Sequence, residues 1–281
     1  MNIDFTQYPD GDLKGQTLVN PMIQNYNGPP ATLRNGTLIN AQILNSANIT
    51  LDGVKIVGDN GKTPVAQIKA KGLFVRRSSR ISILNCDVGR SFVGVTFLDS
   101  PDCRIDASDF HDSRDHFHGT AADGLIISRT AFHDNHNAPG DHPDAIQCFD
   151  GGAGRPIKNI TIQDNIYYRG AGNTSQGIFM QQAYDNLIIM GNVVIGGMGN
   201  GIRADGARSG KIVSNVVYSY IGGKSGLFAS KAIALNGNQA FKFNVGGAFL
   251  KTAPAGNVFN KEIAPLEEAA LVAAWRKRVF G

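Results

Sequence analysis

Glutamate is absent from the first 261 residues of this 281-residue chain, and the three that occur are Glu262, Glu267 and Glu268. The same chain holds 34 Gly, 24 Asn and 20 Asp. Glycine, asparagine and aspartate favour turns and left-handed backbone conformations, whereas glutamate is a good helix former. This composition excludes an all-α fold and disfavours a doubly wound α/β fold. A hydrophobic content of 42% argues equally against a disordered chain.

Cysteine is scarce as well. The three cysteines, Cys86, Cys103 and Cys148, are an odd number without the spacing of a metal site. They are therefore expected to be buried thiols, with Cys148 in the core, rather than parts of a disulfide framework.

Concentrated charge and long apolar runs are also missing. The net charge is +4, and the basic residues are scattered except for Arg276, Lys277 and Arg278, so we expect no nucleic-acid partner. No run of 18 apolar residues occurs, which predicts no membrane partner. The segment Met1–Asp12 has neither the basic flank nor the apolar run of a signal peptide. We therefore expect synthesis in a cytoplasm and action in a virion or outside the cell after lysis.

What the chain does contain is a repeat. An eight-residue segment of alternating apolar residues, interrupted by a small polar turn, recurs with a base period of about 22 residues and longer insertions in some intervals. Its sixth position becomes asparagine in the last three copies, and asparagine suits a stacked turn because it accepts a left-handed conformation and bonds to its neighbours. The copies are Ile49–Ile56, Ile81–Val88, Cys103–Phe110, Leu125–Phe132, Ile160–Tyr167, Leu187–Val194 and Gly210–Val217.

Strands of period two, a 22-residue repeat and a stacked asparagine turn together describe an all-β fold, a single-stranded right-handed parallel β-helix of about eight to nine coils. At this point the sequence resembles the pectate-lyase-like β-helix superfamily. We expect an N-terminal cover over residues 1–30, the β-helix over 31–250 and a C-terminal tail over 251–281. The tail contains one strong helix pattern, Pro265–Arg278, which is expected to close the end of the β-helix or to dock on a partner.

A second short strand precedes most of these segments and carries the candidate site. Its third residue is always apolar and should point inward, so its first and fourth residues should point at least partly outward. On this register Asp115 and Asp144 stack one coil apart with His118 beside them, and Arg203 lies further along the same face. Polar and aromatic neighbours in the same columns, which suit a polysaccharide, are Gln147, Gln176, Phe179 and Asn200.

All six histidines fall within 32 residues, which favours a functional cluster over scattered loop residues. They are His111, His116, His118, His133, His136 and His142. The pattern requires no cofactor. A divalent cation would nevertheless suit the pair Asp115 and Asp144, or the histidine cluster.

Asp115, Asp144 and Arg203 resemble the acids and the arginine of polygalacturonase-type glycosidases. That resemblance implies acid–base catalysis by two carboxylates. A lyase would instead use His142 or His118 as the base, with Arg203 or Arg155 neutralising a uronate carboxylate. The spacing leaves both mechanisms open.

Three hypotheses follow. The first is a virion-associated protein, resembling phage tailspikes, that binds and in one version depolymerises a bacterial surface polysaccharide. It implies a homo-oligomer, because tailspikes are commonly trimers, and contact with other virion proteins through the C-terminal helix. The second is a secreted polysaccharide lyase or glycoside hydrolase of the same superfamily. The third is a non-catalytic structural spike or decoration protein.

Overall fold

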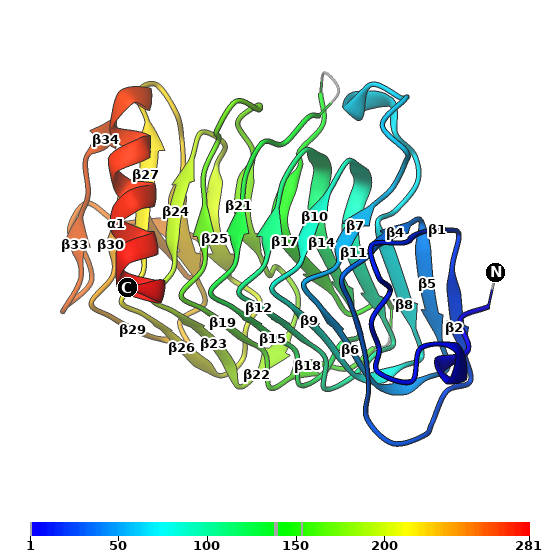
Figure 1. Ribbon diagram of the computed structural model, residues 1–281. Helices are drawn as coiled ribbons and strands as arrows, with labels where there is room; N and C mark the ends of the chain where they lie inside the picture. The colour runs from blue at the N-terminus through cyan, green and yellow to red at the C-terminus, as the bar shows by residue number, and fades with distance from the viewer. Residues whose placement is uncertain (1, 138–139, 153) are drawn as a thin grey trace.

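The chain winds into an elongated right-handed parallel β-helix, seen from the side in Figure 1. The computed structural model describes residues 2–137, 140–152 and 154–281. Successive coils stack along one axis, and the strands pair in parallel with the equivalent strands of the next coil, except that β31 and β32 are antiparallel. Within the described residues no helix is long and apolar enough to cross a membrane. The fold expected from the repeat is confirmed.

Three sheets run along the stack, and we name them A, B and C. Sheet A contains β2 (Met22–Gln24), β5 (Ala41–Leu44), β8 (Leu73–Arg76), β11 (Ser91–Leu98), β14 (Ser113–Thr120), β17 (Asp144–Phe149), β21 (Gln176–Phe179), β25 (Asn200–Ala204), β28 (Gly226–Ala229), β31 (Phe243–Val245) and β32 (Ala248–Phe249). Sheet B contains β3 (Ala31–Arg34), β6 (Ala47–Asp52), β9 (Ser79–Leu84), β12 (Arg104–Asp106), β15 (Ile126–Ser128), β19 (Thr161–Gln163), β23 (Leu187–Met190), β26 (Gly210–Val213) and β29 (Ala234–Asn236). Sheet C contains β1 (Thr17–Val19), β4 (Thr37–Ile39), β7 (Lys55–Val57), β10 (Asp87–Gly89), β13 (Asp109–Phe110), β16 (Ala131–Phe132), β20 (Ile166–Tyr167), β24 (Val193–Gly196), β27 (Val216–Tyr220), β30 (Gln239–Ala240), β33 (Val258–Phe259) and β34 (Glu262–Ile263). Outside them lie the pair β18 (Ile157–Lys158) and β22 (Tyr184–Asp185) and the short helices η1 (Phe5–Gln7), η2 (Val65–Gln67) and η3 (Pro265–Glu267).

The core is a set of apolar columns that run through the coils. Because the register is kept from coil to coil, one inward position of sheet B is isoleucine in six consecutive strands, and all six side chains are fully buried. Branched side chains pack well on a pleated strand, and burying each contributes about 1.5–3 kcal/mol. The column is Ile83, Ile105, Ile127, Ile162, Ile189 and Ile212. Cys86, Cys103 and Cys148 are free, buried thiols, as expected.

The asparagine column forms a hydrogen-bonded ladder inside the turn between sheets B and C. In each step the backbone N–H and the side-chain Nδ2 of one asparagine both donate to Oδ1 of the next, at 3.0 and 2.9 Å between Asn165 and Asn192. The ladder continues through Asn215 and Asn238 to Asn257.

The expectation that these asparagines adopt the left-handed conformation was wrong. The residue before each of them has the positive φ instead, at 56° for Asp164 and 66° for Gly191. The physical reason is that the amide must point inward to bond along the stack. The preceding residue therefore makes the turn.

The coils extend beyond residues 31–250 at both ends, so both boundaries expected from the sequence need correction. β1 and β2 already pair with β4 and β5, and β33 continues sheet C after residue 250. Only the first residues act as a cover, where the ring of Phe5 packs 4.6 Å from that of Tyr26. The first coil escaped detection because its strands are three residues long, too short for a visible alternation.

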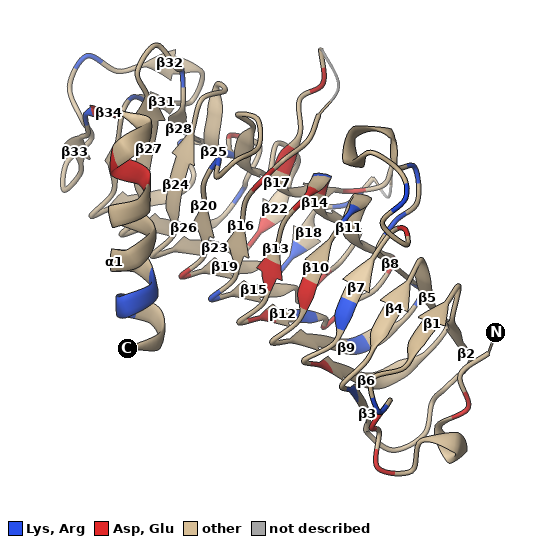
Figure 2. Cartoon of the chain, turned by 45° about the horizontal axis from the view of Figure 1, so that its top comes forward, with Lys and Arg blue, Asp and Glu red and all other residues tan. Residues whose placement is uncertain are grey.

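The C-terminal helix α1 (Glu268–Phe280) lies along the outer face of sheet C rather than across the end of the β-helix (Figure 1). Its indole Nε1 at Trp275 donates to Asp164 O at 2.8 Å, and Trp275 packs among Ile166, Ile195 and Tyr220. Figure 2 shows its acidic first turn and basic last turn, which complement the helix dipole. The helix pattern was therefore predicted correctly, but its position as an end closure was not.

Candidate functional site

The strand pairing of sheet A places the predicted columns together. His118 of β14 pairs with Gln147 of β17, Gln147 with Phe179 of β21, and Phe179 with Arg203 of β25. The first residues of these strands form a first column and also stay in register, because the Asp144 N–H donates to Asp115 Oδ1 at 3.0 Å. Gln176 pairs with Asp144 and accepts a hydrogen bond from the Asn200 side chain.

Asp115 and Asp144 of the first column are more buried than we expected from the sequence. Asp115 and Asp144 are only 5% and 2% exposed, whereas His118 keeps 20% of its side chain exposed. Strict alternation places Asp115 and Asp144 on the same face as the inward Phe117 and Ile146, two residues later, and His116 is fully buried as well. The residues of the second column remain half-buried and accessible.

Asp115 connects the two columns. Its Oδ2 lies 3.4 Å from His118 Nε2, while the guanidinium of Arg114 lies 3.8 Å away and also pairs with Asp141 in the loop before β17. Because Nε2 faces Asp115, Nδ1 is the ring nitrogen of His118 that points away from the carboxylate. The two groups lie at ion-pair distance, and His118 Nε2 has no hydrogen-bond partner among the described residues.

The surroundings of Asp144 change its protonation. Burial, together with the charge of Asp115, raises the pKa of Asp144 to about 8. Its Oδ1 is buried and has no hydrogen-bond partner among the described residues. At neutral pH Asp144 is therefore mostly a neutral acid. It can donate a proton, while the neighbouring His118 can accept one.

Arg203 lies two coils beyond Asp144 in a separate part of the same face. Its guanidinium lies 5.6 Å from the ring centre of Phe179 and 5.8 Å from that of Phe228. Its Nε and Nη2 both donate to Asp205 Oδ2, at 2.9 and 2.7 Å. Arg203 thus belongs to a flat stripe of rings and planar groups and does not contact the carboxylate pair.

Two predicted site residues are not brought to this stripe. His142 is exposed in the loop before β17. Arg155 follows β17 and pairs with Asp123 at 2.8 Å, at the corner between sheets A and B. Both residues lie outside β17, so the strand pairing of sheet A does not place them on the stripe.

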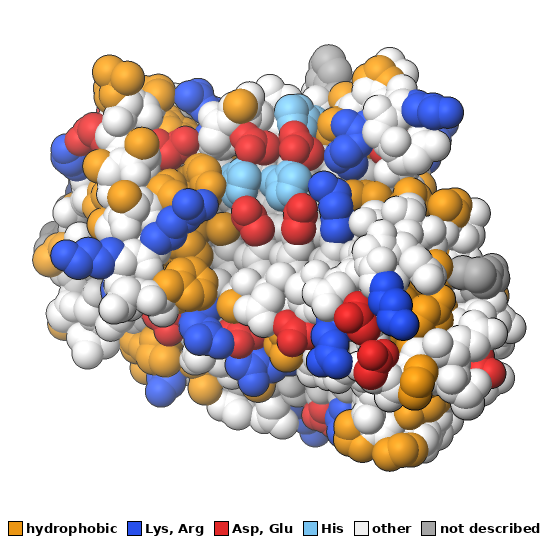
Figure 3. All heavy atoms as spheres, viewed as in Figure 1, with side chains coloured by type: hydrophobic (Ala, Val, Ile, Leu, Met, Phe, Trp, Pro, Cys, Tyr) orange, Lys and Arg blue, Asp and Glu red, His pale blue; other side chains and the backbone are white. Residues whose placement is uncertain are grey.

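The six histidines divide among several surroundings rather than forming one cluster. His116 is fully buried, burial lowers its pKa to about 3, and its Nε2 donates to His133 O at 2.9 Å. His111 and His133 directly follow strands β13 and β16 of sheet C, and His136 lies in the turn towards sheet A and bonds to Asp112. Figure 3 shows histidine and acidic side chains side by side on this face. Among the described residues, no group of three or more His, Cys, Asp and Glu side chains is arranged to hold a metal ion.

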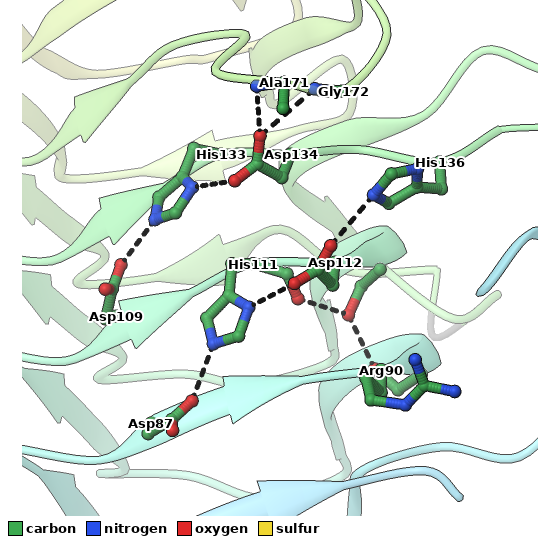
Figure 4. Close-up of polar contacts among 12 residues, drawn as sticks. Asp87, Arg90, Asp109, His111, Asp112, His133, Asp134, His136, Ala171 and Gly172 are labelled. Atoms are coloured by element: carbon green, nitrogen blue, oxygen red, sulfur yellow. Dashed lines mark hydrogen bonds and ion pairs between the residues drawn. The ribbon is translucent and has the colours of Figure 1, made fainter. Parts of the chain in front are cut away.

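The histidines of sheet C belong to a network that the sequence interpretation missed. His111 bonds through Nε2 to Asp87 at 2.7 Å and through Nδ1 to Asp112 at 2.8 Å. His133 makes the same two contacts one coil later, and the two rings stack at 5.7 Å (Figure 4). The hydrogen bonds to Asp112 and Asp87 raise the pKa of His111 to about 10, so its ring is charged and neither nitrogen is free.

A repeated tripeptide could have revealed this network. Phe110-His111-Asp112 recurs as Phe132-His133-Asp134, one 22-residue period later. Equal spacing and equal composition place the two copies in register, so their polar side chains must stack.

The Right handed beta helix region model matches residues 38–217, which is most of the described β-helix. The chain belongs to the right-handed β-helix family. A comparison with curated protein sequences gave no match.

Among solved structures, this β-helix protein is similar in fold to pectate lyase Pel9A, with a TM-score of 0.54 and 13% identity over 88% of this chain and 70% of that one. It is also similar to the Dettilon tailspike protein, with a TM-score of 0.52 and 14% identity over 87% of this chain. The aligned part of this chain covers 60% of the length of that tailspike. At these identities the similarity is one of fold.

Proposed function

We propose that this β-helix protein binds an extended bacterial surface polysaccharide along the outer face of sheet A. The observation that carries the proposal is a column of side chains in successive coils, aromatic or planar and polar at every position except the buried Thr96. Rings stack on sugar faces and amides bond to hydroxyls, and a straight column matches a straight polymer. The column is Phe74, Thr96, His118, Gln147, Phe179, Arg203 and Phe228.

Its biological setting is proposed as a virion, where a tailspike-like protein would recognise the host surface. The fold shared with the Dettilon tailspike supports this setting. The fold shared with pectate lyase Pel9A supports the alternative, a secreted polysaccharide lyase or glycoside hydrolase. A structural spike that binds no sugar is the third alternative, which a binding assay decides.

Binding is tested with a panel of purified bacterial capsular and O-antigen polysaccharides, measured by biolayer interferometry. Phe179→Ala removes the central ring of the column and should weaken binding by up to about tenfold, since a stacking ring contributes roughly 0.5–1.5 kcal/mol. Phe259→Ala removes an exposed ring on sheet C and should leave the affinity unchanged. Equal affinity of both variants for every bound polysaccharide would rule out this face.

Cleavage is a second candidate function, favoured by the raised pKa of Asp144 beside the Asp115–His118 pair. Asp144 would protonate the oxygen of the departing sugar. His118, oriented by Asp115, would accept a proton either from an attacking water, giving hydrolysis, or from the carbon beside a uronate carboxylate, giving elimination. Reducing-end and unsaturated-product assays distinguish these reactions.

Asp144→Asn should lower turnover at least 100-fold while the chain stays folded, and Asp115→Asn should do the same. Wild-type turnover should fall as pH rises through about 8, because Asp144 then loses the proton that it donates. Asp123→Asn, at the opposite corner, serves as the matched control. Full turnover in both site variants would place any catalysis elsewhere.

A further inference from the structure

A hollow of about 300 Å³ opens on the outer face of sheet A, in the coils before His118. Its floor is formed by Gln42 of β5 and Phe74 of β8, which pair with each other. Phe74 pairs in turn with Thr96 and Thr96 with His118, so the hollow lies two coils from His118 on the same column. It is lined by Asn40, Gln42, Lys69, Ala70, Lys71 and Phe74.

Lys71 places a positive charge in this hollow, and no ion pair within the described residues compensates it. Its side chain is half-buried, and burial lowers its pKa. Its Nζ lies 4.5 Å from the centre of the Phe74 ring. The half-buried cations Arg114 and Arg203 of the same sheet pair with Asp141 and Asp205. Within the described part of the chain, neither Lys71 nor Lys69 has an ion pair, although withdrawing an ammonium from water without a counter-ion costs free energy.

The backbone holds Lys71 in place. On one side of it, Ala70 O accepts a hydrogen bond from the Phe92 N–H at 2.8 Å. On the other, the Gly72 N–H donates to Val93 O at 2.9 Å. A Cβ at position 72 would lie 2.5 Å from Gly94 O, so only glycine allows this close approach. The ammonium is therefore presented from a fixed segment, and a ligand that pairs with it does not have to order a loop.

We propose that this hollow binds an anionic substituent of the polysaccharide, a carboxylate, sulfate or phosphate group on the sugar two coils from His118. Lys69 and Lys71 supply the positive charge, Gln42 supplies an amide for a neighbouring hydroxyl, and the ring of Phe74 supports the sugar. The inference rests on the proposed function for the polymer that carries the anion. It adds that acidic polymers are preferred and names the residues responsible.

The test compares matched ligands. From the panel, each acidic polysaccharide that binds is titrated by calorimetry alongside its carboxyl-reduced or desulfated form, which keeps the sugar backbone and loses the charge. Removing the charge should weaken binding to the wild-type chain about tenfold. In Lys69→Gln/Lys71→Gln both forms should bind with the same, weaker affinity. The double variant Lys211→Gln/Lys251→Gln removes the same charge from exposed positions elsewhere and should behave like the wild-type chain.

The outcomes separate the two proposals. If charged and uncharged forms bind the wild-type chain equally, or if the control variant loses as much affinity as the Lys69/Lys71 variant, the anion site is disproved while the polysaccharide face stands. If no polysaccharide binds at all, the proposed function fails. Titration with inorganic sulfate then tests the hollow by itself. Saturable sulfate binding to the wild-type chain that the Lys69/Lys71 variant lacks supports the anion site. No saturable binding to the wild-type chain overturns the anion site.

Discussion

At the scale of single residues, His111 links two coils through charge. It bonds to Asp87 of the preceding coil and to Asp112 beside it, and the hydrogen bond to His111 lowers the pKa of Asp112 to about 2. Gly89 makes room for the ring, since a Cβ there would lie 2.9 Å from the imidazole. Asp87 also forms an ion pair with Lys55, one coil earlier, at 3.4 Å. The basic and acidic positions on the neighbouring strands β7 and β10 are visible in Figure 2.

His111→Gln should lower the free energy of unfolding by about 2 kcal/mol near pH 6, because the carboxylates it bonds to are 46% and 40% exposed and therefore partly screened. The folded pKa of about 10 exceeds the unfolded value of 6.5, so this contribution is complete below pH 6.5 and is lost as pH rises through 10. Urea unfolding at pH 6, 8 and 10.5 measures it, with the exposed His142→Gln as control. A difference that stays constant over this range would contradict the assignment.

At the scale of elements, α1 is attached by hydrogen bonds as well as by packing. Arg169 N and Gly170 N donate to Glu268 at 3.1 and 3.0 Å, while the next two N–H groups, of Ala171 and Gly172, donate to Asp134. Two carboxylates, one from the helix and one from the coil, thus hold four consecutive N–H groups of one loop. The helix is bound to the side of the β-helix at a specific place.

Glu268→Gln should release α1 before the coils unfold, because the loop loses a charged acceptor worth about 1.5–3 kcal/mol. The chain has a single tryptophan, Trp275, so its emission reports helix docking alone. In urea the red shift of the variant should precede the loss of β-sheet circular dichroism. Glu267→Gln affects an ion pair with Lys261 and a hydrogen bond from the Ala264 N–H but no contact to the 169–172 loop, and should keep the two transitions together. Coincident transitions in both variants would show that Glu268 does not control docking.

At the scale of the whole molecule, the β-helix is a one-dimensional stack in which each coil depends on register. Val95 pairs with Leu73 on one side and Phe117 on the other, and Thr96 pairs with His118, so equivalent residues are 22 positions apart. One complete coil can therefore be removed without changing any face of the remaining strands.

Deleting residues 96–117 should give a cooperatively folded chain with a Tm about 5–10 °C below that of the wild-type chain, because one coil of contacts is lost. Deleting residues 96–116 instead places Phe117 outward and His118 inward, and should give an unfolded or aggregated product. Circular dichroism melts and gel filtration compare the two. Equal stability of both deletions would contradict the fixed register.

The sequence predicted the fold and the register of the candidate site residues on sheet A for the same reason, which is repetition. The pairing of His118 with Gln147 and of Phe179 with Arg203 follows from counting along equivalent strands. The burial of Asp115 and Asp144 was missed although each lies two residues before an inward side chain, Phe117 or Ile146, because residues two apart share one face of a strand.

The sequence by itself determined the coils, their register and the asparagine ladder, because each depends on side chains that alternate locally and recur at a fixed interval. Tertiary structure alone decided the burial of His116 against His133 O, the position of α1 on the side of sheet C, and the charge of Asp144. Those outcomes depend on contacts between residues far apart in the chain and on the exclusion of water around them, which no local pattern encodes.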